Sequence, residues 1–392
     1  MKKTLFLLLL LPWLAGCSPG AISTPGIGAV ATEQAAAAAS PTNGIQPTKS
    51  PKQSATVPGT PQPNAKSGQP VLDPLTGLPV KDTALLERRP ILIKVENLPR
   101  DNRPQWGLSF ADLVYEYYTE EGTTRFAALF YSQDSEKVAP IRSARFFDIQ
   151  LMRMYKPFFV FGSAYKDLLV TLGDEFGKWL LLEQPNSCPA ICRYDPNGRN
   201  ILMANTVALQ DYVEKLGMDN SHQSLEGMAF DSAVPAGGDK VDNLYIRYSG
   251  AIYNRWEYNA KTGRYLRFSD AKDDINRDNP VYEALLDRVT GKQIATDNVV
   301  VVLAEYIPLV HTDQAEVNDI KLNGKGPALI ARDGHLFEVQ WQRKNPGDVL
   351  ALIDQQGKPF PFKPGQTWFE VIGKSSVVNV DERGWQFVFL MP

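Results

Sequence analysis

The pattern of apolar positions predicts strands mixed with helices in the first half of the chain. Three short runs rich in β-branched, aromatic or aliphatic residues are separated by turns, at Ile91–Val95, Leu113–Tyr118 and Phe126–Tyr131. Runs of this length and composition are typical of buried strands. A helix is expected over 143–155, where apolar side chains recur at three- and four-residue steps, with Ser143 as its N-cap.

Further along, helices are expected over 164–172 and 207–216, and the texture changes near residue 240. From there on, alternating strands joined by turns predict β-hairpins, one of them with Asp333-Gly334 as its turn. The sequence therefore predicts an α+β fold. A mixed α/β domain is expected over 73–220 and a mainly antiparallel β domain over 235–392, since 392 residues are more than one core usually fills.

Residues 1–17 have the organisation of an export signal. Lys2 and Lys3 precede the leucine-rich run Leu5–Leu11, which is too short to span a bilayer permanently. The segment closes with Leu14-Ala15-Gly16-Cys17, which looks like a bacterial lipobox, in which the cysteine is acylated and becomes the new N-terminus. The alternative is an ordinary secretory peptide with a chance cysteine. We expect an extracytoplasmic protein anchored to a bacterial membrane through lipid on Cys17.

The next segment, residues 18–72, consists mainly of Ala, Pro, Ser, Thr, Gly and Gln. Such a composition cannot bury enough apolar surface to offset the entropy of ordering. We predict a disordered tether, and about fifty flexible residues give it a root-mean-square reach of roughly 40 Å. The whole chain is 43% hydrophobic and 22% charged with a net charge of −3, which is ordinary for a globular protein and gives no nucleic-acid footprint.

The candidate chemistry lies between residues 90 and 148, where acidic and arginine residues are densest. Arg142 and Arg145 flank the start of a predicted helix, where free N–H groups and two guanidinium groups could hold a carboxylate or phosphate. The alternative is that they form ion pairs with Glu116, Glu120 or Asp148. The candidate ligand- or anion-binding residues are Asn97, Arg103, Gln105, Glu116, Arg125, Arg142, Ser143 and Arg145.

An enzymatic alternative would use carboxylates. Glu116 and Glu120 would project to one face of a strand, and burial beside an ionised neighbour could raise the pKa of one of them. A hydrolase or lyase acting on wall glycan or peptide would need such a pair. Gly162-Ser163 lacks the second glycine of a nucleophile elbow, so a turn serine that caps the following helix is the preferred interpretation.

Cys188 and Cys192 are the remaining cysteines. In an exported protein two cysteines this close favour a disulfide, with free thiols and a metal site as alternatives. The spacing is not Cys-x-x-Cys and the histidines lie elsewhere, so neither a metal nor a cofactor is expected.

Several motifs together resemble the YerB-type bacterial lipoproteins, a family built from two domains of unknown function. They are Asn102–Leu108 (NRPQWGL), Ala111–Glu116 (ADLVYE), Glu121–Phe126 (EGTTRF), Pro140–Arg145 (PIRSAR), Gly334–Lys344 (GHLFEVQWQRK) and Gly365–Phe369 (GQTWF). The likeness covers about residues 75–392. The family pattern also has an Arg…His-Asn element, and here Ala204 follows Arg199 where histidine is usual, which argues against a catalytic role for that element.

The resemblance implies a cell-envelope lipoprotein associated with penicillin-binding proteins or cell-wall synthesis, and it implies no established reaction. We therefore expect a non-enzymatic binding or accessory module whose partner is a wall component or a cell-wall synthesis protein. The carboxylate-based hydrolase or lyase is the alternative.

Overall fold

The computed structural model describes residues 70–195, 198–312 and 315–392, which belong to one compact unit. The predicted signal segment 1–17, with Cys17, and nearly all of the predicted tether 18–72 lie outside the described residues. Within the described ranges, no helix is long and apolar enough to cross a membrane.

Strands outnumber helices, as the apolar pattern predicted. The α-helices are α1 (Phe147–Tyr155), α2 (Lys166–Phe176) and α3 (Thr206–Lys215), and the short 3₁₀ helices are η1 (Thr83–Glu87), η2 (Arg100–Asn102), η3 (Leu108–Phe110) and η4 (Gly177–Trp179). The strands are β1 (Ile91–Glu96), β2 (Leu113–Tyr118), β3 (Thr124–Phe130), β4 (Phe158–Val160), β5 (Leu180–Leu181), β6 (Ile191–Tyr194), β7 (Ile201–Ala204), β8 (Asp239–Lys240), β9 (Asn243–Arg247), β10 (Tyr253–Asn259), β11 (Arg264–Asp270), β12 (Tyr282–Ala284), β13 (Ala295–Thr296), β14 (Asn298–Thr312), β15 (Ala315–Lys321), β16 (Gly324–Arg332), β17 (His335–Arg343), β18 (Ala351–Ile353), β19 (Thr367–Gly373), β20 (Val377–Asp381) and β21 (Gly384–Val388). The predicted α+β class is confirmed, with helices in the N-terminal part and a β-rich C-terminal part.

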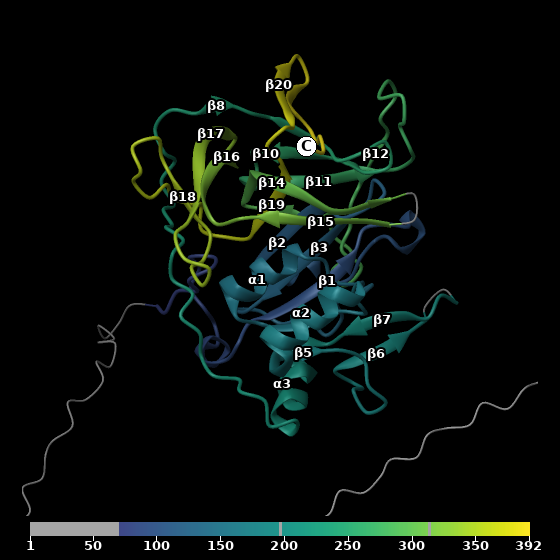
Figure 1. Cartoon of the computed structure of the whole chain (residues 1–392). Helices are drawn as coiled ribbons and strands as arrows, with labels where there is room; N and C mark the ends of the chain where they lie inside the picture. Colours follow the sequence, from purple (N-terminus) through teal and green to yellow (C-terminus); the bar gives the residue numbers. More distant parts are fainter. Residues whose placement is uncertain (1–69, 196–197, 313–314) are drawn as a thin grey trace, which may run out of the picture. The chain divides into compact units, whose positions relative to one another are not determined.

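A 12-stranded sheet forms the centre of the fold and contains strands from both halves of the sequence (Figure 1). Its order is β18-β17-β16-β14-β19-β2-β3-β1-β4-β5, with β15 added to β14 and β8 added to β17. The junction is a parallel pairing of β19 with β2, in which Thr367 lies opposite Leu113 and Val371 opposite Tyr117. The sheet is therefore continuous between the segments 73–220 and 235–392.

The middle strands of this sheet are buried on both faces. Successive side chains along a strand point to opposite faces, so their contacts show what covers each face. Tyr115 and Tyr117 of β2 pack on the helix side, with ring centroids 6.2 and 4.7 Å from that of Phe147 in α1. On the opposite face, Trp368 of β19 packs against Trp256 of β10 at 5.2 Å. The second layer is the 7-stranded sheet β12-β11-β10-β9-β21-β20, with β13 on β11, and β6 and β7 form a separate pair.

Local predictions held for several elements and failed at two helix starts. Strand β2 has the predicted bounds, and the turn at Asp333-Gly334 joins β16 to β17 with both residues at positive φ. Helix α1 begins at Phe147, so Ser143 is not its N-cap; instead the Asp148 carboxylate accepts a hydrogen bond from the Arg145 backbone N–H at 2.7 Å.

The predicted cap of the next helix is also wrong. Helix α2 begins at Lys166, and Tyr165 precedes it without a side-chain cap. The Ser163 hydroxyl lies 2.7 Å from the Ser143 hydroxyl, so each serine has the other as its partner. Both serines therefore face each other across two loops instead of capping helices.

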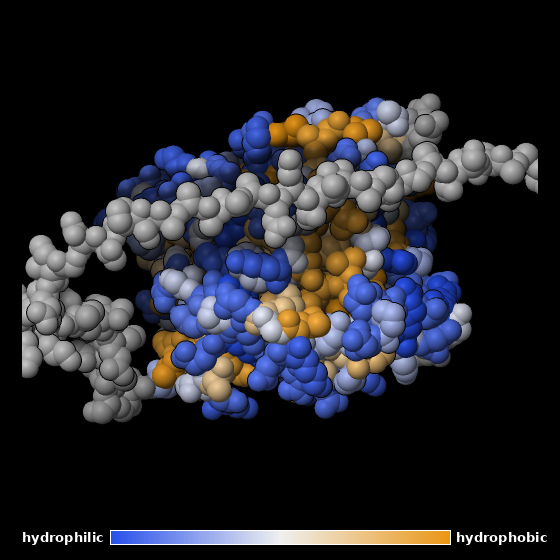
Figure 2. Space-filling view, turned by 60° about the horizontal axis from the view of Figure 1, so that its bottom comes forward, coloured by the Kyte–Doolittle hydropathy of each residue, from blue (hydrophilic) through white to orange (hydrophobic). Residues whose placement is uncertain are grey.

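Figure 2 shows a hydrophobic area bordered by hydrophilic surface on the side that lies at the bottom of Figure 1. The helices of the N-terminal part carry exposed apolar side chains, including Leu169 and Val170 on α2 and Val207 on α3. Single exposed apolar residues are normal on folded proteins, so these residues identify no partner by themselves.

Candidate functional site

Four of the eight predicted binding residues, Asn97, Arg103, Gln105 and Glu116, are buried in the interior. Glu116 and Glu370 flank Arg267 of β11, whose Nη2 lies 2.5 Å from Glu116 Oε2 and whose Nη1 lies 2.7 Å from Glu370 Oε1. All three side chains are 0% exposed. Burial raises the pKa of Glu116 to about 7, opposed by Arg267. Glu116 therefore ties the two sheets together and does not face a described pocket.

Asn97 and Arg103 belong to the same buried region. Asn97 donates to Glu116 and to Thr124 at 3.1 and 2.8 Å, and its side-chain oxygen accepts from Arg103 at 2.8 Å. Arg103 also forms an ion pair with Asp270 at 3.0 Å. These contacts join the loop after β1 to the end of β11. Both side chains therefore stabilise the packing of these two segments.

Gln105 is buried next to the same loop. Its amide nitrogen donates to the Glu96 carbonyl at 2.9 Å, while its side-chain oxygen has no hydrogen-bond partner among the described residues. Gln105 does not line a described pocket, so the structure gives it a supporting position beneath Glu96.

Glu120 lies beyond the end of β2 and does not share a site with Glu116. Arg125 pairs with Glu120 at 2.8 Å, and Arg145 contacts the same carboxylate through two guanidinium nitrogens. The predicted alternative of ion pairing with Glu120 is therefore confirmed for Arg145, and Arg125 shares the same carboxylate. The expectation that Glu116 and Glu120 form one carboxylate pair is wrong, because the strand ends at Tyr118 and the chain turns before Glu120.

Beneath these ion pairs lies a second buried cluster. Lys94 of β1 is hydrogen-bonded to Tyr117 and lies 3.1 Å from the Asp148 carboxylate, and Tyr117 donates to the same carboxylate. Burial, opposed by the nearby Asp148, lowers the pKa of Lys94 to about 7. The strand therefore carries a lysine that is easily neutralised, but the cluster is closed to solvent.

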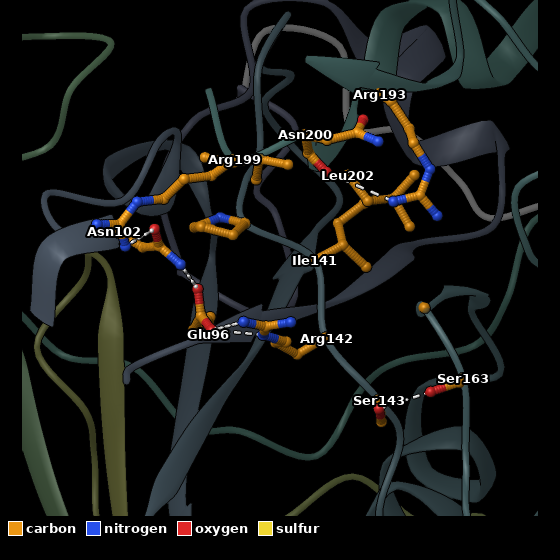
Figure 3. A pocket seen from close by; sticks show the side chains of 13 residues that line it. Glu96, Asn102, Ile141, Arg142, Ser143, Ser163, Arg193, Arg199, Asn200 and Leu202 are labelled. Carbon is orange, nitrogen blue, oxygen red and sulfur yellow. Dashed lines mark hydrogen bonds and ion pairs between the residues drawn. The ribbon is translucent and has the colours of Figure 1, made fainter. Parts of the chain in front are cut away.

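An open polar pocket of about 220 Å³ lies where several segments of the N-terminal part meet. Glu96 comes from the end of β1, Arg142 and Ser143 from the segment beside it, and Ser163 from the loop after β4. Arg193 is on β6, and Arg199 precedes β7. Figure 3 shows Arg199 and Arg193 on opposite sides of the pocket, with Glu96 and Arg142 below them in this view.

The pocket contains a chain of polar contacts anchored on Glu96. The Glu96 side chain is 2% exposed, contacts Arg142 through two guanidinium nitrogens and accepts from the Asn102 amide at 2.6 Å. Arg199 donates to the Asn102 side-chain oxygen at 3.2 Å. Burial raises the pKa of Glu96, and the hydrogen bond from Asn102 and the charge of Arg142 oppose that rise.

The three arginines of the pocket are partly open to solvent. Their side-chain exposures are 45% for Arg142, 49% for Arg193 and 41% for Arg199. Arg193 and Arg199 pair with Glu183 and Asp101, which do not line the pocket, at 2.6 and 2.9 Å. The lining thus holds three guanidinium groups against the single carboxylate of Glu96. Such an arrangement can bind a carboxylate or phosphate group.

Of the predicted binding residues, Arg142 and Ser143 line this pocket. Sequence reasoning missed Glu96, Arg193 and Arg199 as pocket residues. Arg199 had a signal, since it begins the element that resembles the family's Arg…His-Asn motif. In that element Ala204 is buried in β7, and Asn205 caps α3 by accepting from the Ala208 N–H at 3.0 Å.

Cys188 and Cys192 form the predicted disulfide, with their Cα atoms 5.1 Å apart. The bridge closes the turn before β6, the strand that carries Arg193. Among the described residues, no group of three or more His, Cys, Asp or Glu side chains is placed to hold a metal ion.

Comparison with known proteins defines the class of this chain. Residues 75–218 match the family described as "Protein of unknown function (DUF3048) N-terminal domain", and residues 244–369 match the corresponding C-terminal domain. The chain therefore belongs to the DUF3048 family.

The chain is also similar to a named bacterial protein. The Bacillus subtilis (strain 168) protein named "Putative lipoprotein YerB" is 30% identical over 318 residues, which cover 79% of this chain and 88% of that protein. The crystal structure of YerB protein from Bacillus subtilis has a TM-score of 0.65 at 26% identity and covers 77% of this chain and 96% of that chain. The predicted likeness to YerB-type proteins is confirmed.

Proposed function

We propose that this chain is a lipid-anchored envelope protein that binds a carboxylate- or phosphate-bearing wall component, or a cell-wall synthesis protein, without catalysing a reaction. The observation that carries the proposal is the convergence of Arg142, Arg193 and Arg199 on one open pocket. The lipobox ending at Cys17 and the similarity to a protein named a lipoprotein support the anchor and the extracytoplasmic location.

The position and exposure of the Arg142 side chain support the binding of an anionic ligand. Its guanidinium group is held from one side by the buried Glu96, while almost half of its side chain remains open to solvent. A planar guanidinium fixed in this way loses little freedom when it forms a further bidentate contact. Arg199 is oriented by Asn102, which is itself held by Glu96, so the two arginines are positioned by one buried carboxylate.

The hydrolase alternative has less support. Glu116 is fully buried against Arg267, and Glu120 belongs to a different ion-pair cluster. Ser163 in the pocket is hydrogen-bonded to Ser143, and no histidine is among the residues that line the pocket. Binding without catalysis needs only cationic and polar groups, and these are the groups that line the pocket.

The test compares the full-length protein with the double variant Arg142→Ala/Arg199→Ala. Binding is measured by titrating lysozyme-released fragments of purified peptidoglycan, whose peptides carry free carboxylates, at 50 and 500 mM salt. We expect the double variant to bind at least tenfold more weakly, and high salt to weaken wild-type binding because exposed charges are screened.

Arg153→Ala is the matched control, because Arg153 pairs with Glu175 at the surface of α1 away from the pocket. A crosslinking pull-down from native membranes, with the same variants, tests the cell-wall synthesis partner. Equal binding of both probes by the wild type and the double variant would refute the proposal.

A further inference from the structure

A second pocket lies on the outward side of the 7-stranded sheet, in the C-terminal part of the chain. Its volume is about 180 Å³, and its walls come from β9, β20, β21 and residues 277–282. Leu244 and Ile246 of β9 are buried, so the alternation of the strand turns Tyr245 outward. Across the sheet, Tyr245 lies opposite Gln386, and Gln386 lies opposite Asn379. These three residues form one row on the open face.

Two tyrosine rings contribute to the apolar surface of this pocket. The centroids of Tyr245 and Tyr282 are 5.9 Å apart, with an angle of 64° between the planes. The guanidinium carbon of Arg383 lies 5.8 Å from the Tyr245 centroid. The pocket thus offers ring faces beside planar polar groups, and Arg247, Arg277, Arg383 and Asp381 also line it. The tyrosine rings distinguish it from the first pocket, which also has three arginines and one carboxylate in its lining.

The polar groups of the pocket divide into fixed and unused ones. Arg383 and Gln386 both donate to the Asp381 carboxylate, at 2.6 and 3.2 Å. In contrast, four groups make no hydrogen bond to any described residue: the hydroxyls of Tyr245 and Tyr282, the amide of Asn379 and the guanidinium of Arg277. The pocket therefore combines a preorganised edge with several polar groups that have no partner among the described residues and are open to a ligand.

We propose that this second pocket binds one ring of a saccharide. A pyranose ring presents C–H groups on its faces and hydroxyls around its rim, which match aromatic faces surrounded by planar hydrogen-bonding side chains. The volume is below the range of 300–1,000 Å³ that is usual for pockets holding larger ligands, so a single ring is the unit that fits.

The experiment uses the full-length protein in a detergent without a sugar headgroup, titrated with chitotetraose, the tetramer of N-acetylglucosamine, by isothermal titration calorimetry. Tyr245→Ala removes a ring face and should raise the dissociation constant on the order of tenfold. Asn379→Ala should raise it by a few-fold, because it removes hydrogen bonds only. Tyr165→Ala, an exposed tyrosine next to α2, is the matched control and should leave binding unchanged.

The two pockets can be separated in the same experiment. Arg142→Ala/Arg199→Ala should leave chitotetraose binding unchanged. Tyr245→Ala should leave unchanged the salt-dependent part of the binding of lysozyme-released fragments, which carry sugars as well as peptides. Asn379→Ala lies on an exposed edge strand, so it keeps the test informative if Tyr245→Ala fails to fold. The proposal is overturned if the wild type does not bind chitotetraose, or if Tyr245→Ala and Asn379→Ala bind it as well as Tyr165→Ala.

Discussion

Replacing Arg267 with methionine should destabilise the fold strongly, because it removes the positive centre of a buried ion triad. Arg267 on β11 lies between Glu116 on β2 and Glu370 on β19, at 2.5 and 2.7 Å, and no side chain of the three is exposed. It also lies against Trp368, whose ring centroid is 4.7 Å from the guanidinium carbon. Methionine keeps most of the apolar contact with Trp368. The change in stability therefore reports mainly the loss of the positive charge.

The expected magnitude follows from the two carboxylates that the substitution leaves behind. Removing one partner of a buried ion pair costs about 3–5 kcal/mol, since the remaining charge is left unpaired in the interior. Urea unfolding, followed by circular dichroism at pH 8, measures the loss directly. Arg153→Met is the control, because its pair with Glu175 is about one-third exposed and should contribute no more than about 1 kcal/mol.

The pH dependence provides an independent check. Burial already raises the pKa of Glu116 to about 7 in the presence of Arg267, and the loss of that positive charge should raise it further. A carboxyl group whose pKa is raised in the folded state favours folding when protonated, and this contribution is lost as the pH rises through the folded-state pKa. The destabilisation caused by Arg267→Met should therefore shrink as the pH falls from 8 to 5.

A second variant separates the charge from the packing. Glu116→Gln/Arg267→Met/Glu370→Gln removes all three charges and should be more stable than Arg267→Met alone at pH 8. A loss below about 1 kcal/mol for Arg267→Met, or a loss that does not change between pH 8 and pH 5, would contradict the view that the triad joins the two sheets.

Two further predictions concern the anchor and the buried lysine. Cys17→Ala should move the protein from the membrane fraction to the soluble fraction, and a variant that stays on the membrane would exclude lipid on Cys17 as the tether. The pKa of Lys94 is lowered by burial from 10.5 to about 7, so the unfolded chain binds the extra proton between these values and stability rises with pH across that window. Lys94→Met should remove up to about 1.4 kcal/mol per pH unit of this rise, measured by urea unfolding at pH 7, 8 and 9; identical pH slopes for the two proteins would exclude the shift.

Strands and turns that depend on neighbouring residues in the sequence could be predicted from the sequence alone. Strand β2 matches its predicted bounds because β-branched and aromatic residues of suitable length identify a buried strand without reference to distant neighbours. The turn at Asp333-Gly334 is set by two adjacent residues that tolerate positive φ. The start of α1 was misplaced because Ser143, Asp148 and their neighbours offer competing caps, and tertiary contacts select among them.

The roles of the charged residues were decided by the tertiary structure. From the sequence alone, Arg103, Arg125, Arg142 and Arg145 were all candidates, with Arg142 and Arg145 singled out at the predicted helix start. Of these four, Arg142 is the one that lines the pocket. The difference arises from partners far away in the chain, since Arg103 meets Asp270 and Glu116 meets Arg267 only after β11 packs on the central sheet. The parallel pairing of β19 with β2 joins residues more than two hundred positions apart, and no local pattern specifies it. The local sequence therefore determined which segments form strands and helices, and it carries the motif that predicts a lipid anchor. Long-range packing decided which charged side chains became interior ion pairs and which remained open to a ligand.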